Sequence, residues 1–193
     1  MNAAERPFLM CVEDVFGRTP GREVMLTGQI ERGRVRKDDE VEIVGLGGSG
    51  IVPVAAIEAS RRRIDEASAD MNVGLLLTGL AADAVTRGQV LAAPGTVDAH
   101  VGFAADIMLL SEEHGAAEVR TGDRLQFHVR TAVVLGVVTL PHHTDVLHPL
   151  HMGTATVTLD QPIALEEGQS VSFRHHGRAA GSGTVTQVLR RVP

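Results

Sequence analysis

The sequence has very little lysine, and this scarcity excludes one class of enzyme. Lys37 is the single lysine among 193 residues, and it stands between Arg36 and Asp38. A phosphate-binding loop of the G-x-x-x-x-G-K-[ST] type needs glycine amides that converge on the phosphates and a lysine that reaches the terminal ones. The sequence contains no such loop, so we expect no hydrolysis of nucleoside triphosphates by this chain alone.

Large aromatic side chains are also scarce. The chain has no tryptophan, no tyrosine and five phenylalanines, and its net charge is −6. Proteins that bind nucleic acid unaided usually present a basic face or aromatic stacking platforms. The overall balance therefore argues against unaided binding of nucleic acid, and we expect no DNA partner, although basic residues gather in two stretches, residues 32–37 and 61–63.

Long apolar runs and cysteine pairs are missing as well. No run approaches the roughly 20 apolar residues that span a bilayer, and the N-terminus lacks the layout of a secretion signal. We therefore expect a cytoplasmic protein with no membrane partner. Cys11 is the one cysteine, so an internal disulfide is excluded. We predict that Cys11 is a small buried side chain and not a nucleophile.

The apolar residues that are present follow a β-strand pattern. They recur at period two or in short runs, with turn-forming residues every 8 to 12 positions or so, which is typical of all-β barrels and sandwiches. Only residues 80–86 resemble a helical turn. Turn residues at 93–96 and the confinement of all nine histidines to positions after 97 indicate two units. The sequence predicts two antiparallel β-barrels in tandem, residues 1–97 and 98–193.

Two motifs suggest chemistry that their context does not support. Residues 45–50 match the dinucleotide pattern G-x-G-x-x-G, but a strand containing Pro53 follows instead of a helix, which favours a hairpin loop. Four histidines within residues 142–151 have poor metal-ligand spacing and favour a solvated loop over a metal site. No G-x-S-x-G or H-E-x-x-H pattern occurs, so we expect no catalytic residue, metal or cofactor.

Several stretches together resemble a known family. They are residues 7–10, 13–16, 27–33, 39–45, 72–77, 87–92 and 94–96, and more loosely residues 110–113, 126–127, 130–131, 140–141, 162–165, 177–178 and 181–183. In order and spacing, the first set resembles the second domain of elongation factor Tu, the GTPase that carries aminoacyl-tRNA, and the second set resembles its third domain. The resemblance implies two antiparallel barrels.

The resemblance also implies a binding site. In that family the second domain holds the aminoacylated 3′ terminal adenosine of tRNA, and the matching positions here are Glu13, Asp14, Phe16, Glu58, Arg61, Asn72 and Leu76. Glu58 is then expected to accept a hydrogen bond from a ribose 2′-hydroxyl, which distinguishes RNA from DNA. Arg61 is expected to pair with a terminal phosphate, Asn72 to bond near the amino group, and Leu76 to form an apolar wall.

Some positions depart from the family pattern. Arg18 and Thr19 stand where an apolar contact to the adenine is expected, and Ala59 and Ser60 replace bulky residues, so we expect a looser pocket. Residues 115–118 replace a basic stretch that helps contact the tRNA stem. Fewer cationic contacts predict weaker and steeply salt-dependent binding.

The resemblance begins at residue 7, where the family has already completed its GTPase domain, so we expect that domain to be absent from this chain. Two functions remain open. One is a non-enzymatic module that binds the aminoacyl-tRNA 3′ end, now or ancestrally. The other is a protein-interaction module that docks a GTPase, an exchange factor or the ribosome in trans. A truncated gene without a function is a third alternative.

Overall fold

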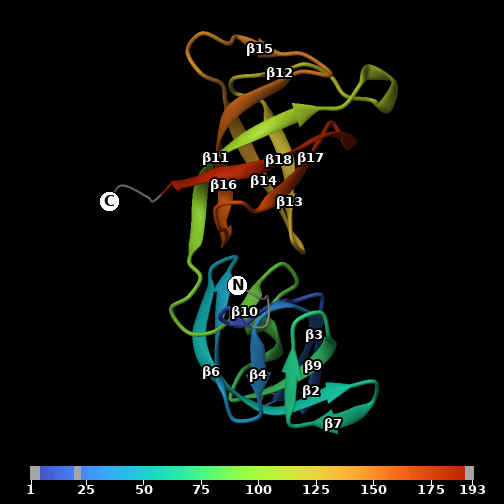
Figure 1. The fold of residues 1–193 in the computed structure, drawn as a ribbon, viewed down its shortest axis with the longest axis vertical. Helices are drawn as coiled ribbons and strands as arrows, with labels where there is room; N and C mark the ends of the chain where they lie inside the picture. The colour runs from blue at the N-terminus through green and yellow to red at the C-terminus, as the bar shows by residue number, and fades with distance from the viewer. Residues whose placement is uncertain (1–4, 20–22, 190–193) are drawn as a thin grey trace. The chain divides into compact units, whose positions relative to one another are not determined.

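The computed structural model describes residues 5–19 and 23–189, and the chain divides into two compact units (Figure 1). The first unit spans residues 1–99 and the second residues 100–193. The sequence-based division lies after Val97, close to this boundary. Each unit contains a closed barrel around its own buried apolar side chains.

The first barrel is closed by six strands in the order β1-β10-β5-β6-β9-β3, with β3 pairing back to β1. Strand β2 lies beside β3, β7 lies beside β6, and β4 pairs with β8 apart from the barrel. The elements of this unit are β1 (Leu9–Cys11), β2 (Asp14–Thr19), β3 (Glu23–Arg32), β4 (Arg34–Arg36), β5 (Glu40–Gly45), β6 (Gly48–Ala59), β7 (Arg62–Ile64), β8 (Glu66–Ser68), β9 (Asn72–Thr78), η2 (Ala82–Ala84) and β10 (Val90–Ala92).

Alternation along the strands separates the core of this barrel from its outer surface. Leu26 on β3, Ile57 on β6, and Leu75 and Leu77 on β9 are fully buried inside the barrel. Successive side chains on a strand point to opposite faces, so the residues between these face outward. The outer faces of β3, β9 and β6 therefore carry the side chains of these strands that do not enter the core.

The second barrel is closed in the order β11-β16-β14-β13-β17-β18, and β12 pairs with β15 apart from it. Its elements are β11 (Ala99–Leu109), η3 (Glu112–His114), β12 (Val119–Arg120), β13 (Arg124–Val129), β14 (Ala132–Thr139), β15 (Val146–Leu147), β16 (Met152–Ala164), β17 (Ser170–His175) and β18 (Arg178–Leu189). Three phenylalanines fill the core. The ring centroids of Phe103 and Phe127 are 5.8 Å apart, and those of Phe127 and Phe173 are 5.9 Å apart, distances at which aromatic pairs attract.

Strand β14 is apolar on both faces. Its inward side chains, such as Val134 and Val138, are buried, whereas the outward Val133 and Leu135 are 51% and 46% exposed. A strand with an uninterrupted apolar sequence is usually covered on both sides. Here only the inner face of β14 is covered by described residues.

The structure confirms the all-β prediction. No α-helix occurs within residues 5–19 and 23–189, and the helical turn predicted at 80–86 is the short 3-10 helix η2. The glycine motif at 45–50 is a hairpin, with Gly45 paired to Gly48 across a turn at Leu46 and Gly47. In the described part of the chain, no helix is long and apolar enough to cross a bilayer. No group of three His, Cys, Asp or Glu side chains there is arranged to hold a metal ion.

Two histidines of the second unit carry buried nitrogens without a hydrogen-bond partner. These atoms are Nε2 of His128 on β13 and Nδ1 of His175 on β17. Burial lowers the pKa of His128, and the nearby Arg174 lowers it further. Burial also lowers the pKa of His175, as does the stacked ring of His176, while Asp123 opposes the shift. The fold therefore favours the neutral form of both histidines.

The second unit is expected to lose stability in mild acid. In the unfolded chain both histidines titrate near the ordinary value of 6.5, above their folded pKa. At a pH between the folded pKa and the unfolded pKa, the unfolded state binds more protons than the folded state. The free energy of unfolding therefore falls as the pH drops below the unfolded pKa. Urea unfolding followed by circular dichroism at about pH 7.5 and about pH 5.5 measures this loss.

The double variant His128→Gln and His175→Gln separates these two sites from the other histidines. This variant should show a smaller difference in the free energy of unfolding between the two pH values. The variant His143→Gln, in an exposed loop, should show the same difference as the parent. An equal pH dependence in the parent and the double variant would mean that other groups cause the acid sensitivity.

Candidate functional site

The outer face of the first barrel carries a polar row of residues across four strands. Asp14 on β2 pairs with Thr27 on β3, Thr27 with Gly74 on β9, and Gly74 with Glu58 on β6. Directly opposed residues on neighbouring strands present their side chains on the same face, close enough to interact. Four segments that are distant in the sequence therefore contribute to one surface.

An apolar row runs beside it. Phe16 pairs with Met25, Met25 with Leu76, and Leu76 with Ala56. Met25, Ala56 and Leu76 form a small apolar cluster separate from the barrel core, and Phe16 is 53% exposed at the end of the row. This arrangement leaves one aromatic ring free to contact a ligand above a firm apolar base.

Two adjoining hollows lie over these rows. The larger hollow has a volume of about 410 Å³ and is lined by Phe16, Met25, Thr27, Glu58, Arg61 and Gly74. The smaller hollow has a volume of about 260 Å³, shares Thr27, Glu58 and Gly74 with it, and adds Glu13, Ser60 and Asn72, among others. Because Glu58 lines both hollows, one ligand that fills both would pass this carboxylate.

Two glycines make room for the hollows. A Cβ atom added at Gly74 would lie 2.7 Å from Sδ of Met25, so the shared floor is open because this residue has no side chain. A Cβ atom added at Gly28 would lie 1.8 Å from the carbonyl oxygen of Cys11. The close approach of the chain at Gly28 is accompanied by a hydrogen bond from the Glu13 amide to the Thr27 carbonyl, 2.8 Å long. Together these contacts fix Glu13 beside the smaller hollow.

A tight turn positions Arg61. Ala59 and Arg62 pair at the end of the β6–β7 hairpin, and the two residues between them, Ser60 and Arg61, have φ angles of 48° and 64°. Two left-handed residues define a type I′ turn, which usually contains glycine or asparagine. Side chains at such positions cost on the order of 1 kcal/mol each, and strain of this kind is often found at functional sites.

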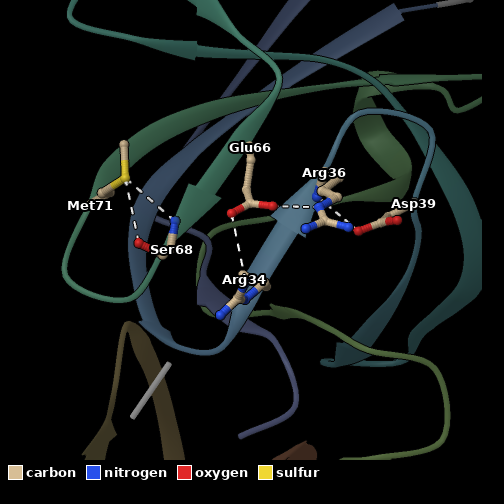
Figure 2. A network of polar contacts seen from close by, with 6 residues as sticks. All are labelled: Arg34, Arg36, Asp39, Glu66, Ser68 and Met71. Atoms are coloured by element: carbon tan, nitrogen blue, oxygen red, sulfur yellow. Dashed lines mark hydrogen bonds and ion pairs between the residues drawn. The ribbon is translucent and has the colours of Figure 1, made fainter. Parts of the chain in front are cut away.

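The two basic stretches differ in how much charge they leave available. In the stretch at 32–37, Arg32 is buried and its Nε donates to the Pro7 carbonyl at 3.2 Å. Glu66 forms ion pairs with both Arg34 and Arg36, as Figure 2 shows, and the hydrogen bond that Arg36 donates to Glu66 raises the pKa of Arg36. Arg61–Arg63, by contrast, are all exposed at the β6–β7 hairpin.

A hollow of about 580 Å³ also occurs elsewhere in this unit, without any of the predicted site residues. Its polar lining includes Arg6 and Arg34 together with Glu5, Asp39 and Glu40. Charges of opposite sign offset one another there, so this hollow offers no clear preference for one class of ligand. The pair of smaller hollows is the better candidate because it contains five of the seven predicted site residues and combines an exposed aromatic ring with acidic and basic side chains.

Most of the residues predicted from the sequence come together in the two hollows. Glu13, Phe16, Glu58, Arg61 and Asn72 line them. Asp14 is exposed at the end of the polar row, outside the hollows, and Leu76 is only 8% exposed because Met25 and Ala56 pack against it. Leu76 therefore supports the floor and does not form the expected wall. The side chains of Arg18 and Thr19 lie outside the described residues.

Sequence reasoning missed Met25, Thr27, Gly28 and Gly74, which lie in the resembling stretches or beside them. Strand alternation could have identified Met25 and Thr27, because Val24 and Leu26 point into the core and positions 25 and 27 therefore face outward. The arrangement as a whole suits a ligand with three parts. Phe16 and Met25 can contact a flat apolar group, the carboxylates can accept hydrogen bonds from hydroxyl or amino groups, and Arg61 can pair with an anion.

Comparison with protein families identifies both units. Residues 24–92 match the family model described as elongation factor Tu domain 2, and residues 96–189 match the one described as the elongation factor Tu C-terminal domain. The first match contains most residues of the two hollows and the whole β6–β7 hairpin, whereas Glu13 and Phe16 precede it. The chain belongs to the elongation factor Tu family, as a translation elongation factor-like module that comprises the second and C-terminal domains.

Proposed function

We propose that the first unit binds the aminoacylated 3′ end of an RNA in the two adjoining hollows, in the cytoplasm, and acts by binding rather than catalysis. The observation that carries the proposal is the convergence of Phe16, Glu58, Arg61 and Asn72 around the glycine floor at Gly74. Membership of the elongation factor Tu family supports this class of ligand, since that family carries aminoacyl-tRNA. The apolar, acidic and basic groups of the hollows suit the base, the sugar with its aminoacyl group, and the phosphate of such an end.

The chemistry assigns a place to each part of the ligand. The base lies against Phe16 and Met25 in the larger hollow, and the terminal phosphate lies at Arg61. Glu58 accepts a hydrogen bond from the 2′-hydroxyl, which a deoxyribose end cannot donate. The aminoacyl group enters the smaller hollow, where Glu13 and Asn72 face its amino group.

Gly74→Ala is expected to block this site while leaving the barrel folded. The added methyl group fills the shared floor, and Met25, a flexible side chain, can move away from it. We expect about a tenfold or greater loss of affinity for a trinucleotide with a stable 3′-aminoacylamino adenosine. Stability should change by less than about 1 kcal/mol. Titration at low salt, followed by amide NMR shifts, measures the affinity, and urea unfolding measures the stability.

The turn variant Gly47→Ala is a matched control, because nothing lies near that position and it is outside the hollows. It should bind as the parent does. Unchanged amide shifts around Glu58 and Asn72 in the parent would refute the proposal. That outcome would favour the alternative, a module that docks a GTPase, an exchange factor or the ribosome in trans, for which the exposed Val133 and Leu135 on β14 are the supporting observation.

A further inference from the structure

Arg62 and Arg63 are exposed cations that the fold does not use. Neither makes an ion pair with any residue in the described part of the chain, and both lie on β7, which pairs only with β6. Figure 1 shows β7 at the margin of the first unit, beside the barrel strands. Figure 2 shows a different situation on β4, where both Arg34 and Arg36 form ion pairs with Glu66. The free positive charge of this hairpin is therefore concentrated next to the larger hollow.

The hairpin register separates the two arginines. Arg63 pairs with Glu58, and Arg62 pairs with Ala59. Since paired residues share a face, the Arg63 side chain lies on the face of the hairpin that carries Glu58 and the hollows, and the Arg62 side chain lies on the reverse face. Arg61, which lines the larger hollow, and Arg63 thus follow one another on the same side of the hairpin.

We propose that Arg63 is a second phosphate site, which holds the RNA backbone as the strand leaves the larger hollow. This inference rests on the proposed function and deepens it. A ligand that engages both Arg61 and Arg63 has at least two phosphodiester groups, so the unit recognises the end of a strand and discriminates against a free aminoacyl nucleoside. Two successive guanidinium groups on one face suit successive phosphates, because each pairs with phosphate oxygens in a bidentate manner.

The affinity from Arg63 should come largely from counterion release. An RNA single strand loses about 0.7 of a condensed counterion for each phosphate that the protein neutralises. The logarithm of the binding constant therefore falls more steeply with the logarithm of salt concentration when Arg63 takes part. The net charge of the chain is −6, so the overall charge of the protein does not attract RNA and the gain has to come from local contacts such as this one.

The test compares two substitutions in the full chain. Arg63→Gln removes the cation on the hollow side, and Arg62→Gln removes the same charge one residue away on the reverse face. The probes are 3′-aminoacylamino adenosine, which has no phosphate, and a trinucleotide that ends in the same group and has two phosphodiesters. Binding is measured by calorimetry or NMR titration over a series of salt concentrations.

We expect Arg63→Gln to weaken trinucleotide binding roughly threefold to tenfold at low salt and to reduce the salt slope by about 0.7. Arg62→Gln should leave the slope unchanged, and neither substitution should affect the nucleoside probe. Equal losses for Arg62→Gln and Arg63→Gln would overturn the second phosphate site in favour of a diffuse charge effect. If the salt slope of trinucleotide binding were the same in both variants as in the parent, the second phosphate site would be overturned as well. Failure of the parent to bind either probe would instead refute the proposed function.

Discussion

Replacing Arg130 by alanine is expected to lower the free energy of unfolding of the second unit by about 3–5 kcal/mol. The Arg130 guanidinium donates to the Ala164 carbonyl at 3.1 Å and to Oε2 of Glu166 at 2.8 Å. The arginine side chain is 4% exposed and that of Glu166 is 26% exposed. Removing the cation leaves the carboxylate and the carbonyl partly buried without this partner, which costs more than the pair itself contributes.

The position of Arg130 explains why one residue has so large an effect. It lies in the turn between β13 and β14 with a φ angle of 52°, a left-handed conformation that is unfavourable for arginine. Its contacts join this turn to Ala164 at the end of β16 and to Glu166 just after that strand, both distant from Arg130 in the sequence. Alanine would keep the unfavourable backbone conformation and lose the contacts, so no compensating gain is expected.

Arg124→Ala provides a control of the same chemistry. Arg124 forms an ion pair with Asp160, but these side chains are 55% and 44% exposed, so the loss should stay below about 1 kcal/mol. The chain has no tryptophan or tyrosine, so urea unfolding is best followed by far-ultraviolet circular dichroism, with hydrogen exchange to assign the loss to the second unit. Equal unfolding midpoints for Arg130→Ala and Arg124→Ala would show that burial does not strengthen the Arg130 pair.

The fold was accessible from the sequence because its signals are local. The short apolar run at 73–77 and the period-two alternation at 125–130 predicted strands that the structure contains, and the glycine motif at 45–50 was correctly interpreted as a hairpin from the strand that follows it. Short helices were harder to place. Residues 80–86 contain only the three-residue 3-10 helix η2, because no apolar stripe of helical period anchors a longer one.

The site was accessible only in part, because it depends on register between distant strands. The resemblance supplied Glu58, Arg61 and Asn72, which the structure brings together at the hollows. It could not show that Met25 covers Leu76, since that contact follows from the pairing of β3 with β9. Nor could spacing alone show that Glu66 forms ion pairs with two arginines of the first basic stretch, while the second stretch has no ion pair among the described residues.

Gly28→Ala is expected to destabilise the first unit by at least about 4 kcal/mol, beyond the range of ordinary substitutions. The added Cβ would lie 1.8 Å from the Cys11 carbonyl oxygen and 3.0 Å from its carbonyl carbon. Both are backbone atoms of β1, which pairs with β3 and β10 and so closes the barrel. Strand β1 would have to move away from β3, at the expense of hydrogen bonds on both sides.

Two effects of this substitution oppose one another, and their magnitudes decide the outcome. Alanine restricts the unfolded chain more than glycine does, which by itself stabilises a protein by about 0.4–1 kcal/mol where the backbone conformation permits. The overlap with Cys11 is far larger, because neither backbone atom can rotate away. Gly47→Ala is the matched control: nothing lies within 4 Å of its added Cβ, and its φ of +78° should cost only about 1 kcal/mol.

Gly28→Ala should also abolish binding of the RNA end to the first unit, while the second unit stays folded. Glu13 reaches the smaller hollow because its amide donates to the Thr27 carbonyl at 2.8 Å, next to the contact between Gly28 and Cys11. Displacement of β1 would break this bond and withdraw Glu13. In amide NMR spectra, the first-unit signals should collapse while those of the second unit persist. A Gly28→Ala chain with an unfolding free energy within about 1 kcal/mol of the parent would contradict the close packing of β1 against β3.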